Sequence, residues 1–123
     1  MIALDTNTVS LLLKGEIDIA ADSTLYIPYV VVAELRSGVA SGSDPKKYGA
    51  VLDQFFNGTD VVVSPGLSEE VIMTYVEIYG YLKKKGTPVS PNDLWIAAEC
   101  MYLSLALLTR DTDFQKIPHI RKA

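Results

Sequence analysis

The chain has 123 residues, of which 49% are hydrophobic and 21% charged, and its formal net charge is −4. These values exclude a disordered chain and suit one globular domain, residues 1–123, that buries its own core. No apolar run approaches the roughly 20 residues of a membrane-spanning helix. Cys100 is the single cysteine, and Asp5 interrupts the apolar N-terminus where a secretion signal would continue. We therefore expect a cytoplasmic protein without a membrane partner.

The first half of the chain alternates short apolar runs with helical patterns. Residues 1–4 predict a strand that is covered on both faces, and a short apolar helix follows from Thr8 to about Lys14. Residues 25–27 predict a second strand, which ends at Pro28. A helix is expected from Tyr29 to Gly38, although its β-branched residues are poor helix formers.

The second half continues this alternation. Asp44 is expected to cap a helix that runs to Phe56, and residues 60–63 predict a third strand. The longest helix is expected over residues 68–85, between an acidic first turn and a lysine-rich last turn. A further helix is expected to start at residues 90–93 and end near Leu103. Residues 105–109 predict a fourth strand, and residues 117–120 predict a short edge strand. The alternation predicts an α/β fold with a central parallel sheet between two layers of helices.

Two acids directly follow predicted strands. Asp5 comes after the first strand and Asp111 lies just beyond the fourth. In open α/β sheets, ligands bind at the carboxyl ends of the strands, so both acids are candidate site residues. The alternatives are that Asp5 caps a helix and that Asp111 is a turn residue.

Three further acids are candidate site residues, and each could instead have a purely structural role. Asp93 follows Ser90 by three residues in a capping-box pattern, which explains it without any chemistry. Glu34 lies in an otherwise apolar helical turn, where either a site role or a solvated helix face is possible. Asp113 could join Asp111, and a capping or turn role explains it equally well.

The remaining composition favours metal chemistry based on carboxylates. His119 is the single histidine, which excludes zinc sites made of several histidines, and no glycine-rich phosphate-binding motif is present. Clustered carboxylates are hard oxygen ligands that select Mg²⁺ or Mn²⁺. Metal sites of this kind catalyse phosphoryl transfer and hydrolysis.

Four segments together resemble the PIN-domain family, and more closely its VapC-type toxin ribonucleases: Asp5-Thr6-Asn7, Glu34-Leu35, Asn92-Asp93-Leu94-Trp95-Ile96-Ala97-Ala98 and Leu108-Thr109-Arg110-Asp111-Thr112-Asp113-Phe114. The resemblance covers the whole chain in order and spacing. It implies a PIN-like three-layer fold and a Mg²⁺- or Mn²⁺-dependent endoribonuclease that acts as the toxin of a toxin–antitoxin pair. It further implies an RNA substrate, a homodimer and inhibition by a small antitoxin protein.

The resemblance also assigns roles to individual residues. It implies that the catalytic and metal-binding acids are Asp5, Glu34, Asp93 and Asp111. Positions that match the family's polar supporting residues are Thr6, Asn7 and Thr109, to which the nearby Asp113 is added. Hydroxyl and amide groups at such positions can orient a carboxylate or a bound water.

Two rival functions remain open at this point. A phosphoacceptor receiver domain has similar length, acidity and α/β alternation, but it needs an aspartate after its third strand, where this chain has Ser64. A catalytically silent PIN-like domain would bind RNA or protein without cleaving it. Metal-dependent RNA cleavage would distinguish the silent domain from the enzyme.

Overall fold

A parallel sheet of four strands forms the centre of the computed structural model, which describes all residues from 1 to 123. Its strands are β1 (Ile2–Leu4), β2 (Leu25–Ile27), β3 (Val61–Val63) and β4 (Ala106–Leu108). They lie in the order β3-β2-β1-β4, so β1 is central and flanked by β2 and β4. All three neighbouring pairs are parallel, and Ile2 is paired with both Leu25 and Ala106. The carboxyl ends of the strands therefore share one edge of the sheet, as the sequence predicted.

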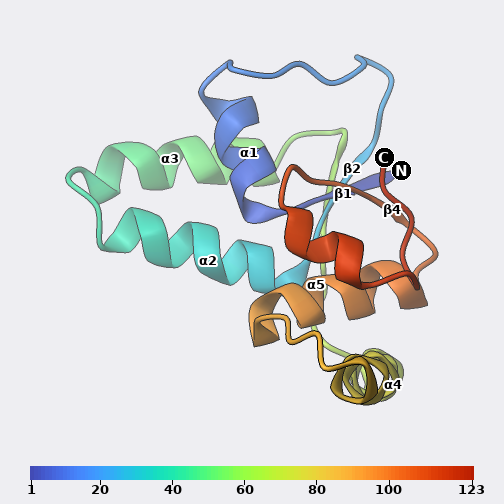
Figure 1. Ribbon diagram of the computed structural model, residues 1–123. Coiled ribbons are helices and arrows are strands. Elements are labelled where there is room, and N and C mark those ends of the chain that lie inside the picture. The colour runs from blue at the N-terminus through green and yellow to red at the C-terminus, as the bar shows by residue number, and fades with distance from the viewer.

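Five helices and one 3₁₀ turn surround the sheet. They are α1 (Thr6–Leu13), α2 (Tyr29–Ala40), α3 (Pro45–Phe56), α4 (Glu69–Lys85), α5 (Pro91–Tyr102) and η1 (Thr112–Lys116). In Figure 1, α1, α2 and α3 lie together on the left, whereas α4 and α5 lie below the strands. The predicted helices are confirmed, and the arrangement is the expected layered α/β fold. None of them is long and apolar enough to span a membrane.

Local capping explains where several helices begin and end. The Asp44 side chain accepts a hydrogen bond from Lys47 N at 3.1 Å, and the Ser68 hydroxyl accepts one from Val71 N at 3.2 Å. At the end of α4, Gly86 has a φ of 67°, a left-handed conformation that is easily adopted without a Cβ atom. These caps satisfy backbone groups that would otherwise lack partners inside the helix.

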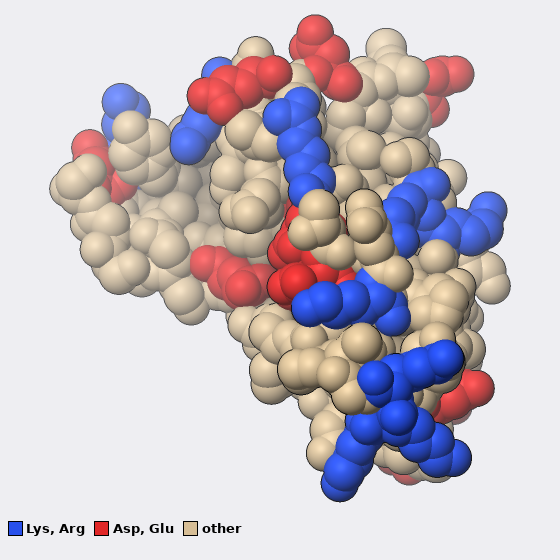
Figure 2. Space-filling view, in the orientation of Figure 1, with Lys and Arg blue, Asp and Glu red and all other residues tan.

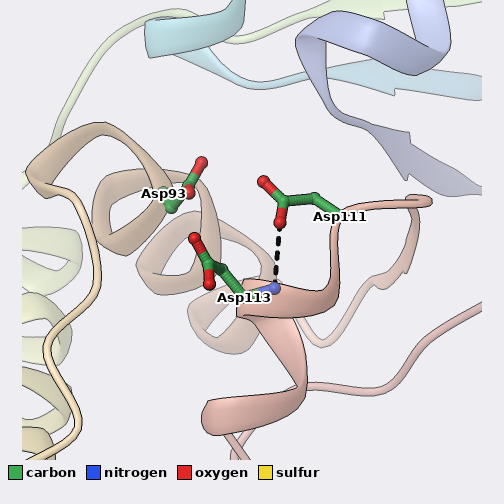
Figure 3. A group of neighbouring side chains, drawn as sticks. All are labelled: Asp93, Asp111 and Asp113. Carbon is green, nitrogen blue, oxygen red and sulfur yellow. Dashed lines mark hydrogen bonds between the residues drawn. The ribbon is translucent and has the colours of Figure 1, made fainter.

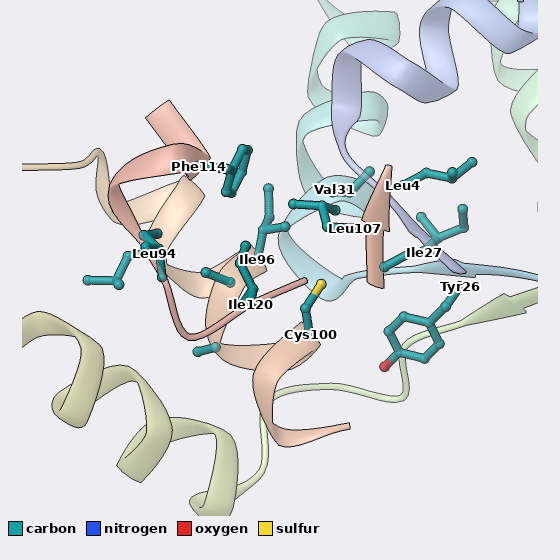
Figure 4. Close-up of a cluster of buried hydrophobic side chains, with 14 of the residues drawn as sticks. Leu4, Tyr26, Ile27, Val31, Leu94, Ile96, Cys100, Leu107, Phe114 and Ile120 are labelled. Carbon is teal, nitrogen blue, oxygen red and sulfur yellow. The ribbon is translucent and has the colours of Figure 1, made fainter. Parts of the chain in front are cut away.

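The core lies where the central strands meet the inner faces of the helices (Figure 4). Leu4 and Leu107 from neighbouring strands are fully buried, as are Ile78 of α4 and Phe114 of η1. Burial of each such side chain contributes about 1.5–3 kcal/mol. The core therefore holds the start of α1, the end of β4 and the η1 turn against the same edge of the sheet.

The tail differs from the sequence prediction, because residues 117–120 form no strand. Ile117 and Ile120 are buried in the core instead, and Pro118 between them has no N–H to donate to a sheet. Pairing with β4 occurs beyond this segment, where Leu107 forms an isolated parallel bridge with Lys122. The edge-strand prediction was thus wrong in position, and the contact is limited to this bridge.

Candidate active site

Asp5 connects β1 to α1 and is held by two donors. It is 5% exposed, and its Oδ1 accepts a hydrogen bond from Thr8 N at 3.0 Å, so it is the N-cap of α1. Its other oxygen accepts a hydrogen bond from the Thr109 hydroxyl, which lies just after β4. Asp5 therefore does cap a helix, as the alternative interpretation of the sequence predicted. The second hydrogen bond shows that the same carboxylate also joins the two neighbouring strand ends.

Thr109 continues this connection to the acids that follow β4. Its Oγ1 accepts a hydrogen bond from Asp111 N at 3.0 Å while its hydroxyl donates to Asp5. Asp111 Oδ1 in turn accepts from Asp113 N at 2.9 Å and caps the η1 turn. A short chain of hydrogen bonds thus links Asp5, Thr109, Asp111 and Asp113.

Asp93, Asp111 and Asp113 form a cluster of three carboxylates (Figure 3). One oxygen from each lies within 4.8 Å of the others, and all three residues are half-buried. Asp93 comes from the first turn of α5, where the Ser90 hydroxyl accepts a hydrogen bond from Asp93 N at 3.2 Å. The capping pattern identified in the sequence therefore directs the Asp93 side chain toward the edge of the sheet. We call this group the three-acid cluster.

Glu34 lies on α2 and receives hydrogen bonds from two different elements. Thr6 Oγ1 of α1 donates to Glu34 Oε1 at 2.6 Å, and Asn92 Nδ2 of α5 donates to Glu34 Oε2 at 3.3 Å. These contacts place Glu34 between the start of α1 and the start of α5. A purely solvated helix face does not describe Glu34, because both of its oxygens are engaged.

The acids interact electrostatically. Burial is the largest cause that raises the pKa of Asp93 above its usual value, and the negative charges of Asp111, Asp113 and Glu34 raise it further. The hydrogen bond with Ser90 acts in the opposite direction. A cation placed among these carboxylates would relieve their mutual repulsion.

One cation of the chain already contacts the cluster. Lys116 Nζ lies 3.1 Å from Asp113 Oδ1 and donates a weaker hydrogen bond to Pro88 O at 3.4 Å. Both side chains of the Lys116–Asp113 pair are more than 40% exposed, so solvent screens the interaction. Figure 2 shows the same pattern more broadly, with acidic side chains gathered centrally on this face and lysine and arginine side chains around them.

Most residues that the sequence proposed for the site lie in one region, but the three-acid cluster itself contains Asp113 and leaves out Asp5 and Glu34. Asp5 and Glu34 adjoin this region through hydrogen bonds with Thr109 and Asn92.

Asn7 is the exception among the proposed residues, because it is exposed and its side chain makes no hydrogen bond. The adjacent Thr8 was not proposed, although it is buried and its hydroxyl donates to Leu108 O at 3.1 Å. Asn92 was also missed as a supporting residue; its place next to Asp93 in the first turn of α5 was the available signal.

The arrangement fits a divalent cation by its donor chemistry. Its charged ligands are carboxylate oxygens, with threonine hydroxyls and one amide as orienting groups. Such oxygen donors suit hard cations rather than metals that prefer thiolate or imidazole. The receiver-domain alternative is not supported, since β3 lies at the edge of the sheet and leads into the buried Ser64.

Known proteins resemble the chain over most of its length. VapC ribonuclease Y4jK of Sinorhizobium fredii is 32% identical, with 91% of this chain and 88% of the relative covered. Ribonuclease VapC1 of Haemophilus influenzae is 26% identical, with 96% and 92% covered. The solved structure of VapBC2 from Rickettsia felis, bound to a DNA fragment from their promoter, contains a chain that is 26% identical. It superimposes with a TM-score of 0.87 over 100% of this chain and 98% of that one.

The family model described as "PIN domain" matches residues 2–120, which include every acid of the candidate site. The matched region begins in β1 and extends beyond η1, so it covers the complete sheet. Sequence, fold and relatives agree, and the chain belongs to the PIN domain family, among its VapC-type members.

Proposed function

We propose that the chain is a metal-dependent endoribonuclease and the toxin of a toxin–antitoxin pair. The observation that carries this proposal is the three-acid cluster, in which Asp93, Asp111 and Asp113 lie within 4.8 Å of one another at the carboxyl edge of the sheet. Relatives that cover nearly the whole chain are named ribonucleases, which supports RNA as the substrate.

The residues that would hold the metal are Asp93, Asp111 and Asp113, with Asp5 and Glu34 beside them. The donor set suits Mg²⁺ or Mn²⁺. A divalent cation bound there supplies polarisation of a phosphoryl oxygen and activation of water.

The supporting residues orient several of the acids. Thr109 fixes both Asp5 and the backbone of Asp111, and Thr6 and Asn92 fix Glu34 from two helices. Each of these groups donates to a carboxylate or positions one, so Asp5, Glu34 and the backbone of Asp111 are already oriented before substrate arrives. This gives Thr6 and Thr109 positioning roles rather than catalytic ones.

Binding of the RNA backbone is assigned to the basic residues of the last third of the chain. These candidates are Lys83, Lys84, Lys85, Arg110, Lys116, Arg121 and Lys122. They flank the acids in the sequence, and Figure 2 shows Lys and Arg side chains around the acidic centre. Because contacts with phosphates release counterions, RNA affinity should fall steeply as salt increases.

An antitoxin is proposed to occupy the groove between α1, α2 and α3. This groove has a volume of about 490 Å³, and its lining includes Thr6 and Glu34 as well as the apolar Leu13, Val39 and Val51. A bound segment would therefore lie directly beside the acids, which is a physical route to inhibition. The solved VapBC2 structure, whose toxin-like chain shares this fold, supports a protein partner.

A homodimer is proposed through the N-terminal half of α4. Ile72, Met73 and Val76 are 38%, 57% and 52% exposed there and form one apolar stripe at helical spacing. Homodimer interfaces are enriched in such side chains and commonly have twofold symmetry. Light scattering at micromolar concentration should give twice the 13.5 kDa mass of the chain, and a strict monomer would contradict the dimer.

The test of the function is direct cleavage. Purified protein is incubated with total cellular RNA and Mg²⁺, and new 5′ ends are mapped. We expect discrete new ends that disappear in EDTA and in Asp111→Asn. RNA that binds but stays intact would instead support the catalytically silent alternative. Co-expression with the cognate antitoxin should suppress the cleavage.

A further inference from the structure

A second cavity lies near the three-acid cluster, and of its lining residues only Lys83 is among the candidates for binding the RNA backbone. It has a volume of about 270 Å³ and lies between the last turns of α4 and the segment that leads into α5. Its lining residues are Tyr79, Leu82, Lys83, Gly86, Thr87, Pro88, Val89 and Leu94. The walls are mainly apolar, and Lys83 supplies a positive charge at the opening.

The cavity shares structural elements with the cluster. Leu94 directly follows Asp93 on α5. On the other side, Pro88 O accepts the hydrogen bond from Lys116, which is paired with Asp113. A ligand that occupies the cavity would therefore be a near neighbour of whatever is bound at the three acids.

Three aromatic residues support one wall of the cavity. The rings of Trp95 and Tyr75 have centroids 4.0 Å apart, and Tyr75 and Tyr79 are stacked with planes 8° apart and centroids 6.4 Å apart. Trp95 and Tyr75 are partly buried against the core, whereas Tyr79 is 51% exposed. The row therefore ends in a half-exposed aromatic ring that lines the cavity.

We propose that this cavity binds one nucleobase of a single-stranded RNA, next to the phosphate held at the three-acid cluster, by stacking on Tyr79. This inference rests on the proposed function and adds a base-binding position to it. Stacking on an aromatic ring is a common way to hold an unpaired base, and it tolerates different sequences. Lys83, which lines the cavity one turn after Tyr79, is complementary in charge to a phosphate beside that base.

The positive charges around the cavity favour RNA over a hydrophobic peptide as its ligand. Lys83 lines the cavity, and Lys116 donates a hydrogen bond to the backbone of Pro88, another lining residue. The phosphates of an RNA strand can pair with these lysines, and one of its bases can stack on the ring of Tyr79. The apolar stripe of Ile72, Met73 and Val76 belongs to the preceding turns of α4 and lacks such cations.

The test compares a single-stranded RNA dodecamer with an abasic strand of the same length and charge. Affinities are measured by fluorescence anisotropy on the Asp111→Asn background, so that no cleavage is needed and the test is independent of the proposed activity. We expect the base-containing strand to bind about five- to tenfold more tightly, as a single stacked base predicts. Tyr79→Ala should abolish this preference, whereas Tyr79→Phe should retain it.

The matched control is Tyr102→Ala, because Tyr102 is also half-exposed but lies at the opposite end of α5 from Asp93. This variant should keep the preference for the base-containing strand. Equal affinity for both strands, or a preference that survives Tyr79→Ala, would overturn the base-binding position. A change of oligomeric state in Tyr79→Ala would also overturn it, since the effect would then act through assembly. If the wild-type chain cleaves no RNA, that result contradicts the proposed ribonuclease activity but not the base-binding position.

Discussion

Thr6 and Glu34 are 28 positions apart in the sequence, and the 2.6 Å hydrogen bond from Thr6 Oγ1 to Glu34 Oε1 joins α1 to α2 at the site. Thr6 directly follows Asp5, so this bond couples the residue after β1 to an acid of a different helix. Asn92 holds the other oxygen of Glu34 from α5. The position of Glu34 thus depends on three helices at once.

Removing the Thr6 hydroxyl should impair catalysis without unfolding the protein. Thr6→Val keeps the shape of the side chain but leaves Glu34 with only its longer bond to Asn92. Loss of a residue that orients a metal-site carboxylate typically costs 10–100-fold in activity or metal affinity. We expect a decrease of about tenfold in RNA cleavage and a weaker Mn²⁺ affinity, measured by calorimetry. Thr6→Ser, which keeps the hydroxyl, should restore most of both.

Asp5→Asn separates a ligand role from a capping role. Asparagine caps a helix as well as aspartate does, so the hydrogen bond from Thr8 N should remain. The acceptor of the Thr109 hydroxyl loses its charge, and we expect cleavage to fall by roughly 100-fold or more if Asp5 serves the metal. The melting temperature without metal should hold or rise, by no more than about 4 °C or about 1 kcal/mol, because the substitution relieves repulsion among neighbouring carboxylates.

The control for this variant is Asp22→Asn, since Asp22 is exposed and precedes the amino end of β2, whereas the acids lie at the carboxyl ends of the strands. It should leave both cleavage and melting temperature unchanged. If Asp5→Asn cleaves RNA as well as the wild type does, Asp5 caps α1 and has no role at the metal site.

The raised pKa of Asp93 predicts a pH dependence of stability. Burial and the neighbouring carboxylates raise this pKa above the usual 3.8, so the folded chain holds the Asp93 proton where the unfolded chain has lost it. The free energy of unfolding contributed by Asp93 therefore decreases as pH rises from the usual value through the raised one, and is constant above that. Metal affinity should change in the opposite direction, because the bound form needs the charged carboxylate.

The measurement is urea unfolding in EDTA between pH 4 and pH 7, with Asp93→Asn beside the wild type. Subtracting one curve from the other removes the contribution of acids that do not interact with Asp93. The wild type should lose stability relative to the variant as pH rises through this window. A difference that is independent of pH, or one that favours the wild type at higher pH, would contradict the raised pKa.

Lys116 should weaken metal binding. Its Nζ lies 3.1 Å from Asp113 Oδ1, so it neutralises part of the charge that attracts a divalent cation. Lys116→Gln should increase Mn²⁺ affinity about two- to fivefold, a modest change because the pair is exposed to solvent. Lys116→Arg should resemble the wild type, as should Lys46→Gln on the exposed surface of α3. A weaker affinity in Lys116→Gln would mean that Lys116 mainly orients Asp113.

Cys100 should be unreactive while the chain is folded. Burial raises the pKa of its thiol to about 12, with a further contribution from the charges of Glu99 and Asp5. Because the thiolate is the reactive form, a disulfide reagent at pH 8 should not modify the native protein. One thiol per chain should react after denaturation. Rapid modification of the native protein would show that α5 opens readily.

The sequence predicted the elements well because their signals are local. Pro28 ends β2, Asp44 and Ser90 cap α3 and α5, and Gly86 ends α4, and each of these acts within a few residues of its own position. The alternation of strands and helices then restricts the topology to a parallel sheet. The acids could be proposed for the same reason, since each one adjoins an element boundary or an apolar turn.

Contacts between distant elements could not be predicted in this way. Glu34 is positioned by residues 28 and 58 places away, and nothing near Glu34 in the sequence indicates either partner. Glu99 was missed for the same reason. It is 1% exposed in α5, where it accepts hydrogen bonds from the Tyr26 hydroxyl at 2.6 Å and from Tyr29 N at 2.8 Å. Only the packing of α5 against the end of β2 makes its burial possible.

The two ends of the chain lie close together on the side of the sheet that faces away from the acids (Figure 1). Ile2 of β1 pairs with Ala106 of β4, and Ala123 N donates to Leu107 O at 2.8 Å. A short linker could therefore join the ends, and new ends could be opened in the exposed turn at residues 41–44 between α2 and α3. Such a circular permutant should fold with its acids intact, and affinity tags at either end of this chain should leave the edge that carries the acids free.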